Sequence, residues 1–135
     1  MAEIDQIISE LARSNGWRGL QSRAQFEAAW ESFVDQCFKG YEMSIYEFEN
    51  DRSVRAMIQI LLDQDSIQEA WGFEEFKNSI SRIDSRFRGI LQGGVQVNAP
   101  SAPWWERGVP EYAGSELSED FMNIFGVQVR IGGQD

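Results

Sequence analysis

Apolar residues recur at helical spacing through most of residues 1–92 of this 135-residue chain, and this pattern restricts the possible folds most strongly. In one stretch, Phe76, Ile80 and Ile83 follow each other at steps of four and three, which places them on one face of a helix. Stripes of the same kind occupy residues 4–11, 26–37 and 54–62. Amphipathic helices with short connections pack as an antiparallel bundle or array, so we expect a mainly α fold of about four to five helices.

The length suits a single domain, which we expect to span residues 1–135. Its helical core would cover residues 1–92, with the last long helix running to Leu91 and ending at Gly93-Gly94. Residues 93–135 contain all three prolines and the pair Trp104-Trp105, which is typical of a loop-rich cap. One short helix is expected within this cap, ending near Phe125.

The cap also contains the same four residues twice. Gly-Val-Gln-Val occurs at residues 94–97 and again at 126–129, each time alternating apolar and polar side chains. Alternation of this kind is typical of a β-strand with one buried face. We therefore predict that the two quartets pair as a small two-stranded ribbon over the helices.

Several serines stand where a helix would begin. A serine followed three residues later by Gln or Glu is the capping-box pattern, in which the hydroxyl accepts a hydrogen bond from a free backbone amide. The serines expected to begin helices are Ser22, Ser44, Ser53, Ser66 and Ser118. Asn50 and Asp51 are interpreted in the same way, as acceptors at a helix start, with Arg55 pairing back to Asp51 one turn later.

The residues most often used in catalysis are nearly absent. The chain contains no histidine and one cysteine, Cys37, which excludes Ser–His and Cys–His nucleophile pairs and the common zinc sites. Cys37 lies on an apolar helix face, where a buried and inert thiol is expected. We therefore expect a binding protein and not an enzyme, with no catalytic residues, no cofactor and no metal site.

The expected compartment is the cytoplasm. A single cysteine forms no disulfide within the chain, which fits a reducing environment. The N-terminal residues lack the basic start and apolar run of a signal peptide, and no stretch has the roughly 18 apolar residues needed to cross a bilayer. No membrane partner is expected.

Negative charge is concentrated in two segments. The formal net charge is −10, and residues 42–75 hold nine acidic residues against two arginines. A second cluster, residues 106–120, has five acidic residues against one arginine. Arg82 and Arg86 are expected to pair back to residues 42–75 but are too few to neutralise them. This sign disfavours direct contact with nucleic acid and favours a basic protein partner, although acidic surfaces also simply keep proteins soluble.

One stretch of about 20 positions combines the motifs Gly40-Tyr41, Ile45-Tyr46-Glu47-Phe48, Asn50-Asp51 and Val54-Arg55. This pattern resembles that of bacterial contact-dependent growth-inhibition immunity proteins. Arg52 stands where the pattern has a leucine. The resemblance implies a cytosolic protein that binds and neutralises one cognate toxin domain, commonly a nuclease with a basic surface.

The expected binding residues combine the acidic segment with aromatic anchors from the proline-bounded loop. Carboxylates would pair with the partner's Lys and Arg, and Trp and Tyr side chains are frequent hot spots in interfaces. One of the two tryptophans could instead plug the end of the bundle. The expected toxin-binding residues are Glu42, Glu47, Glu49, Asp51, Asp63, Asp65, Glu69, Glu74, Glu75, Trp104, Trp105 and Tyr112.

Two other functions remain open at this point. The first is an all-α, Mg²⁺-dependent nucleotide pyrophosphohydrolase, in which Glu116, Glu119 and Asp120 on one helix face would hold the metal with Glu74-Glu75. The second is an acidic adaptor or nucleic-acid mimic. Mimicry would need regularly spaced carboxylates, whereas this chain has clusters.

Overall fold

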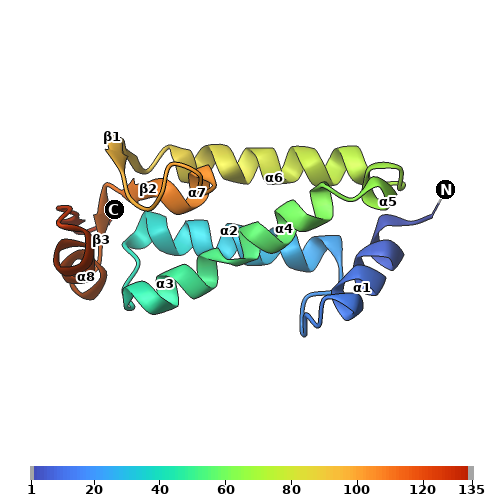
Figure 1. Cartoon of the computed structure of the whole chain (residues 1–135), viewed down its shortest axis with the longest axis horizontal. Coiled ribbons are helices and arrows are strands. Elements are labelled where there is room, and N and C mark those ends of the chain that lie inside the picture. The colour runs from blue at the N-terminus through green and yellow to red at the C-terminus, as the bar shows by residue number, and fades with distance from the viewer. Residues whose placement is uncertain (1, 134–135) are drawn as a thin grey trace.

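The computed structural model describes residues 2–133 and is mainly α-helical, which confirms the predicted fold class (Figure 1). The longer helices are α1 (Ile4–Ser14), α2 (Arg23–Lys39), α3 (Ile45–Arg52), α4 (Val54–Leu62), α6 (Phe73–Arg88) and α8 (Ser115–Phe125). Two helices of four residues, α5 (Asp65–Gln68) and α7 (Trp104–Arg107), lie in connections. The strands are β1 (Leu91–Gln96), β2 (Gly108–Pro110), β3 (Tyr112–Ala113) and β4 (Arg130–Ile131).

The core is centred on α2, which packs against α4 and α6. Phe33 of α2 is buried, and its ring centroid lies 5.6 Å from that of Trp30, 5.3 Å from Phe48 and 5.6 Å from Phe87. Aromatic pairs at these separations stabilise a core beyond the effect of the area they bury. Because the rings come from α2, α3 and α6, the apolar stripes of these helices meet at one place.

The C-terminal region joins the same core. Val97, Val109, Leu117 and Phe121 are buried in the apolar cluster that also contains the stripes of α2 and α6. Phe121 of α8 contacts Phe48 of α3 edge to face, with the ring centroids 5.9 Å apart. Residues 93–133 therefore contribute side chains to the helical core and do not only cover it.

The strands pair differently from the prediction. β1 is antiparallel to β2, β3 is parallel to β4, and the quartets 94–97 and 126–129 do not pair with each other. Gly126 (φ 67°) ends α8 in the left-handed conformation, after which the chain extends toward β3. A small two-stranded antiparallel ribbon is present, as predicted, but it pairs β1 with β2, so the predicted pairing of the two quartets is wrong. Instead the Gln92 Nε2 group donates to the carbonyl oxygens of Pro110 (3.0 Å) and Gln128 (2.9 Å).

Two of the predicted serine caps are confirmed. The Ser22 hydroxyl accepts from the Gln25 amide at 3.2 Å, and the Ser44 hydroxyl accepts from the Glu47 amide at 3.5 Å. Ser53 directly precedes α4, as predicted, but its side chain does not cap that helix. Its hydroxyl donates to the Asn50 carbonyl and its backbone is helical, so α3 leads almost directly into α4.

The other predicted boundaries are wrong for related reasons. α5 begins at Asp65 and α8 at Ser115, so Ser66 and Ser118 lie inside helices, and Ser118 is buried. Asn50 and Asp51 lie in the last turn of α3 and not at a helix start. α6 ends at Arg88, because Leu91 already pairs with Pro110 in the first sheet.

Among residues 2–133, no helix combines the length and the apolar character needed to cross a membrane.

Candidate binding surfaces

The acidic residues of segment 42–75 lie at two opposite ends of the molecule. Figure 1 shows α3 and α8 together at one end, and α5 with the start of α6 at the other. The "α3–α8 end" carries the exposed acids Glu42, Glu47, Glu49, Glu116 and Glu119. The "α5–α6 end" carries the exposed acids Asp63, Asp65, Glu69, Glu74 and Glu75. The segment does not form one continuous acidic surface.

A single hydrogen bond joins the two acidic segments of the sequence at the α3–α8 end. The Asp120 Oδ2 atom of α8 accepts from the backbone amide of Ile45, the first residue of α3, at 2.9 Å. A carboxylate at a helix start satisfies a free amide and is favoured by the helix dipole. Asp120 therefore fixes α8 against α3 and brings Glu116 and Glu119 near Glu42 and Glu47.

Asp51 has a structural role inside this end. The Tyr41 hydroxyl donates to Asp51 Oδ2 at 2.6 Å, and Tyr41 is buried. Burial, together with this hydrogen bond to a carboxylate, raises the pKa of Tyr41 above its ordinary range. Asp51 is half-buried and occupied by Tyr41, so it is not an exposed binding residue as predicted. It also does not pair with Arg55.

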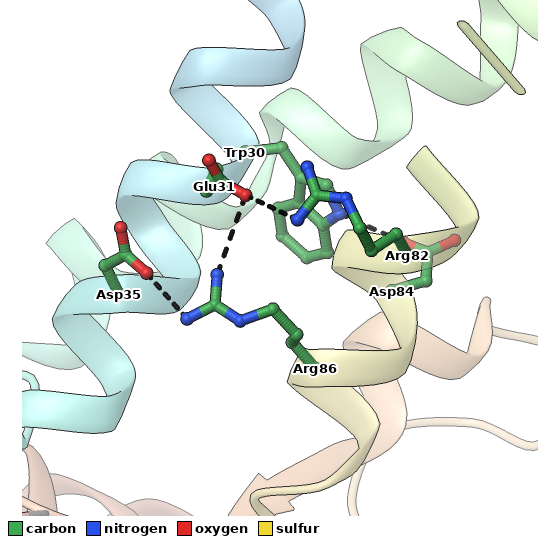
Figure 2. A network of polar contacts seen from close by, with 6 residues as sticks. All are labelled: Trp30, Glu31, Asp35, Arg82, Asp84 and Arg86. Atoms are coloured by element: carbon green, nitrogen blue, oxygen red, sulfur yellow. Dashed lines mark hydrogen bonds and ion pairs between the residues drawn. The ribbon is translucent and has the colours of Figure 1, made fainter. Parts of the chain in front are cut away.

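Arg55 instead forms an ion pair between α4 and α6, in which the guanidinium is buried and the carboxylate is half-buried. Its Nε and Nη2 atoms donate to the two carboxylate oxygens of Asp84 at 2.8 and 2.9 Å. Asp84 Oδ1 also accepts from the indole nitrogen of Trp30 at 3.0 Å (Figure 2). The Arg55 guanidinium lies 4.5 Å from the ring centroid of Trp105. This cluster links α2, α4, α6 and α7.

The arginines of α6 neutralise α2 and not segment 42–75. Arg82 donates to Glu31 at 3.0 Å, and Arg86 donates to Asp35 at 2.8 Å and lies 3.7 Å from Glu31 (Figure 2). The expected pairing of Arg82 and Arg86 with residues 42–75 is therefore wrong, because α6 packs along α2.

Most acids of segment 42–75 consequently remain without an ion pair. In residues 2–133, Glu49 lies 4.0 Å from Arg52 and Glu74 lies 3.9 Å from Lys77, and the other seven acids of the segment have no ion pair. Both of these contacts are long, and Glu49 and Glu74 are exposed. Exposed pairs of this kind contribute little to stability and leave the local potential negative.

The predicted aromatic anchors lie mostly inside the protein. Trp105 is 6% exposed and Tyr112 is 9% exposed, so neither presents its ring to a partner, and their prediction as interface residues is wrong. Trp105 instead packs at the core under Arg55, as the alternative of a bundle plug anticipated. Trp104 is half-buried, and the Arg88 guanidinium covers its ring at 3.8 Å from the centroid.

Sequence reasoning missed the exposed apolar side chains of the α3–α8 end. Tyr46 is 74% exposed, Ile124 is 51% exposed and Met43 is 39% exposed. Tyr46 stands outside the stripe formed by Ile45 and Phe48, and this position off the helical stripe is the signal that could have identified it. At the α5–α6 end the corresponding side chain is Trp71, which is 61% exposed.

Arg52 lines a cavity of about 230 Å³ between α3, α4 and α7. It is 5% exposed, and burial lowers its pKa from the ordinary arginine value. Its guanidinium lies 5.2 Å from the ring centroid of Phe48. Glu49 and Glu106 also line the cavity, so its charge does not favour a free anion.

The carboxylates predicted to hold Mg²⁺ are not brought together. Glu116 and Glu119 lie at the α3–α8 end, whereas Glu74 and Glu75 lie at the opposite end (Figure 1). Asp120 is engaged with the Ile45 amide. No group of three or more Asp, Glu or Cys side chains in residues 2–133 has the arrangement of a metal site. The only cysteine, Cys37, is buried, which raises its thiol pKa.

No family model, curated protein or solved structure matches this chain.

Proposed function

We propose that this protein is a cytoplasmic inhibitor that binds and neutralises a basic protein domain, most specifically the nuclease domain of a toxin. The observation that carries the proposal is the distribution of charge. Arg82 and Arg86 are engaged with α2, while the exposed acids at both ends of the molecule find no strong ion pair among residues 2–133. A basic nuclease surface complements this distribution, and such complementarity speeds association and selects partners.

The resemblance to immunity proteins supports the same function. Within the resembling stretch, Tyr41 and Asp51 bond to each other, and Arg55 binds Asp84. Tyr41, Asp51 and Arg55 therefore stabilise the fold. Tyr46 and Glu47, from the same stretch, are exposed and available for contact.

The test is co-expression with the domain encoded by the adjacent upstream reading frame. We expect the domain alone to arrest growth, and co-expression to restore growth and give a stable complex. The purified complex should fail to cleave nucleic acid, and its dissociation constant should rise with ionic strength because exposed charges are screened by salt.

Two outcomes would contradict the proposal. One is a domain that arrests growth equally with and without this protein. The other is a complex whose affinity does not change between low and high salt, since the attraction between opposite charges would then not contribute. In either case the acidic surface would be explained by solubility alone.

A further inference from the structure

We infer that the α3–α8 end is the docking face, and that Tyr46 and Ile124 are its apolar anchors for a basic segment of a protein partner. This inference rests on the proposed function and specifies where it takes place. It excludes the α5–α6 end, although that end carries more of the exposed acids of segment 42–75, five against three, and an exposed tryptophan.

The two anchors come from the two helices that meet at this end, α3 and α8. Tyr46 directly follows Ile45, whose amide is bound by Asp120. Ile124 follows Asp120 by four residues, which places it one helical turn further along the same face of α8. The bond between Ile45 and Asp120 therefore joins, at one seam, the two helices that carry these exposed apolar side chains.

Carboxylates surround this seam from both helices. Glu47 and Glu49 flank Tyr46 on α3, and Glu116 and Glu119 precede Ile124 on α8. Apolar side chains inside a charged rim are the usual arrangement of an interface, in which buried anchors supply most of the affinity. The sign of the rim selects a partner segment in which Lys or Arg flank an aliphatic side chain.

The α3–α8 end is also held rigid before binding. Phe48 and Phe121 pack against each other in the core, directly beneath the exposed residues of the two helices. Tyrosine loses little conformational freedom on binding, and a fixed backbone reduces the cost further.

The α5–α6 end offers fewer exposed apolar side chains. Each end has one long ion pair near its acids, Lys77 with Glu74 at 3.9 Å and Arg52 with Glu49 at 4.0 Å, so charge alone does not distinguish the two ends. The N-terminal segment also occupies the backbone of Trp71, because the Trp71 amide donates to Ala2 and the Trp71 carbonyl accepts from Ile4. At the α3–α8 end the carboxylates adjoin four large exposed apolar side chains, Met43, Tyr46, Met122 and Ile124, whereas the α5–α6 end has Trp71.

The experiment uses two short labelled peptides, one alternating arginine with leucine and one alternating arginine with serine. Fluorescence anisotropy at low salt measures their affinity for the full chain. We expect tighter binding of the arginine–leucine peptide. Tyr46→Ala should weaken that binding about tenfold, whereas Trp71→Ala, at the opposite end, should change it less than about threefold.

A matched pair of charge reversals tests the rim. Glu42→Lys with Glu119→Lys changes the α3–α8 end, and Asp63→Lys with Glu69→Lys makes the same change in net charge at the α5–α6 end. Measured at about 0.1 M salt, the first pair should weaken peptide binding at least about tenfold more than the second, because interactions between exposed charges are largely screened beyond a Debye length of about 10 Å. All four substituted residues are exposed, and circular dichroism should show unchanged helix content.

Three results would overturn the inference: no measurable binding of the arginine–leucine peptide, equal loss from both charge-reversed variants, or a larger loss from Trp71→Ala than from Tyr46→Ala. These results are distinct from a failure of the proposed function. A toxin domain that is neutralised normally by the Glu42→Lys, Glu119→Lys variant would leave that function standing and remove this docking face. Peptide binding at the α3–α8 end without any neutralised domain would support this docking face and remove the proposed function.

Discussion

Replacing Asp84 with alanine should destabilise the protein more than any substitution on its surface. Asp84 holds both Nε and Nη2 of Arg55, which is 4% exposed, and accepts the indole proton of Trp30. Without the carboxylate, a buried guanidinium keeps one hydrogen bond, to Gln59 at 3.1 Å. Removing one partner of a buried ion pair costs about 3–5 kcal/mol.

The unpaired indole of Trp30 contributes to this loss, since a buried donor without an acceptor costs about 1–3 kcal/mol. The two penalties share one side chain and overlap, so we expect a decrease of about 3–5 kcal/mol in the free energy of unfolding. A domain of this kind has about 5–15 kcal/mol in total, so the variant would be close to its limit of stability. Urea denaturation followed by tryptophan fluorescence measures the change.

Two controls define what would refute this reasoning. Glu31→Ala breaks the exposed pairs with Arg82 and Arg86 and should cost less than about 1 kcal/mol. Adding Arg55→Met to the Asp84→Ala variant should recover part of the loss, because the uncompensated charge is then removed. A cost for Asp84→Ala equal to that of Glu31→Ala, or a double variant less stable than the single one, would contradict the account.

Three further predictions concern buried polar groups and one glycine. Tyr41→Phe removes the hydrogen bond to Asp51 and should lower the free energy of unfolding in urea by about 1.5–3 kcal/mol. Because the pKa of Tyr41 is raised on folding, the contribution of its hydroxyl to stability is complete below the ordinary tyrosine pKa of about 10 and is lost above it. The difference in stability between wild type and Tyr41→Phe should therefore narrow as the pH rises further. Equal gaps at neutral and strongly alkaline pH would contradict this. Cys37 should react with an aromatic disulfide reagent only after the protein unfolds in urea, because its thiol is buried and the thiol pKa is raised. Fast reaction of the native protein would show that the thiol is not buried. Gly40→Ala should lower the melting temperature more than Gly16→Ala. Both glycines have positive φ, but a Cβ at Gly40 would collide with the Gly132 carbonyl oxygen, whereas a Cβ at Gly16 meets open space. Equal decreases in melting temperature would indicate that only backbone strain matters.

The helical core could be predicted from the sequence because its signals are local. The stripe of α6 is buried at Phe76, Ile80, Ile83 and Phe87, as its spacing predicts. Ser22 and Ser44 cap helices because a hydroxyl needs only an amide three residues away. The C-terminal end of α6 and the start of α8 were missed because tertiary contacts decide them, whereas α8 does end at Phe125 as predicted. Leu91 pairs with Pro110, and Gly114, which precedes α8, donates its amide to the Tyr41 carbonyl.

The candidate surface could be predicted only in its sign. Composition identified the acidic segments, but their division between two ends depends on how α3 to α6 run through the molecule (Figure 1). The bond between Asp120 and the Ile45 amide spans 75 positions, and no local pattern indicates it. Trp105 and Tyr112 were assigned to the surface from their proline-rich surroundings, yet their rings complete the core, because a loop with several large apolar residues has to bury them.

The central claim is that the α3–α8 end binds the partner. Hydrogen–deuterium exchange on the complex with the toxin domain encoded by the adjacent upstream reading frame tests it most directly. The account predicts slower exchange over residues 42–50 and 115–125 when the partner is bound, with no change over residues 60–75. Protection confined to residues 60–75, or spread evenly along the chain, would contradict the assignment of binding to the α3–α8 end.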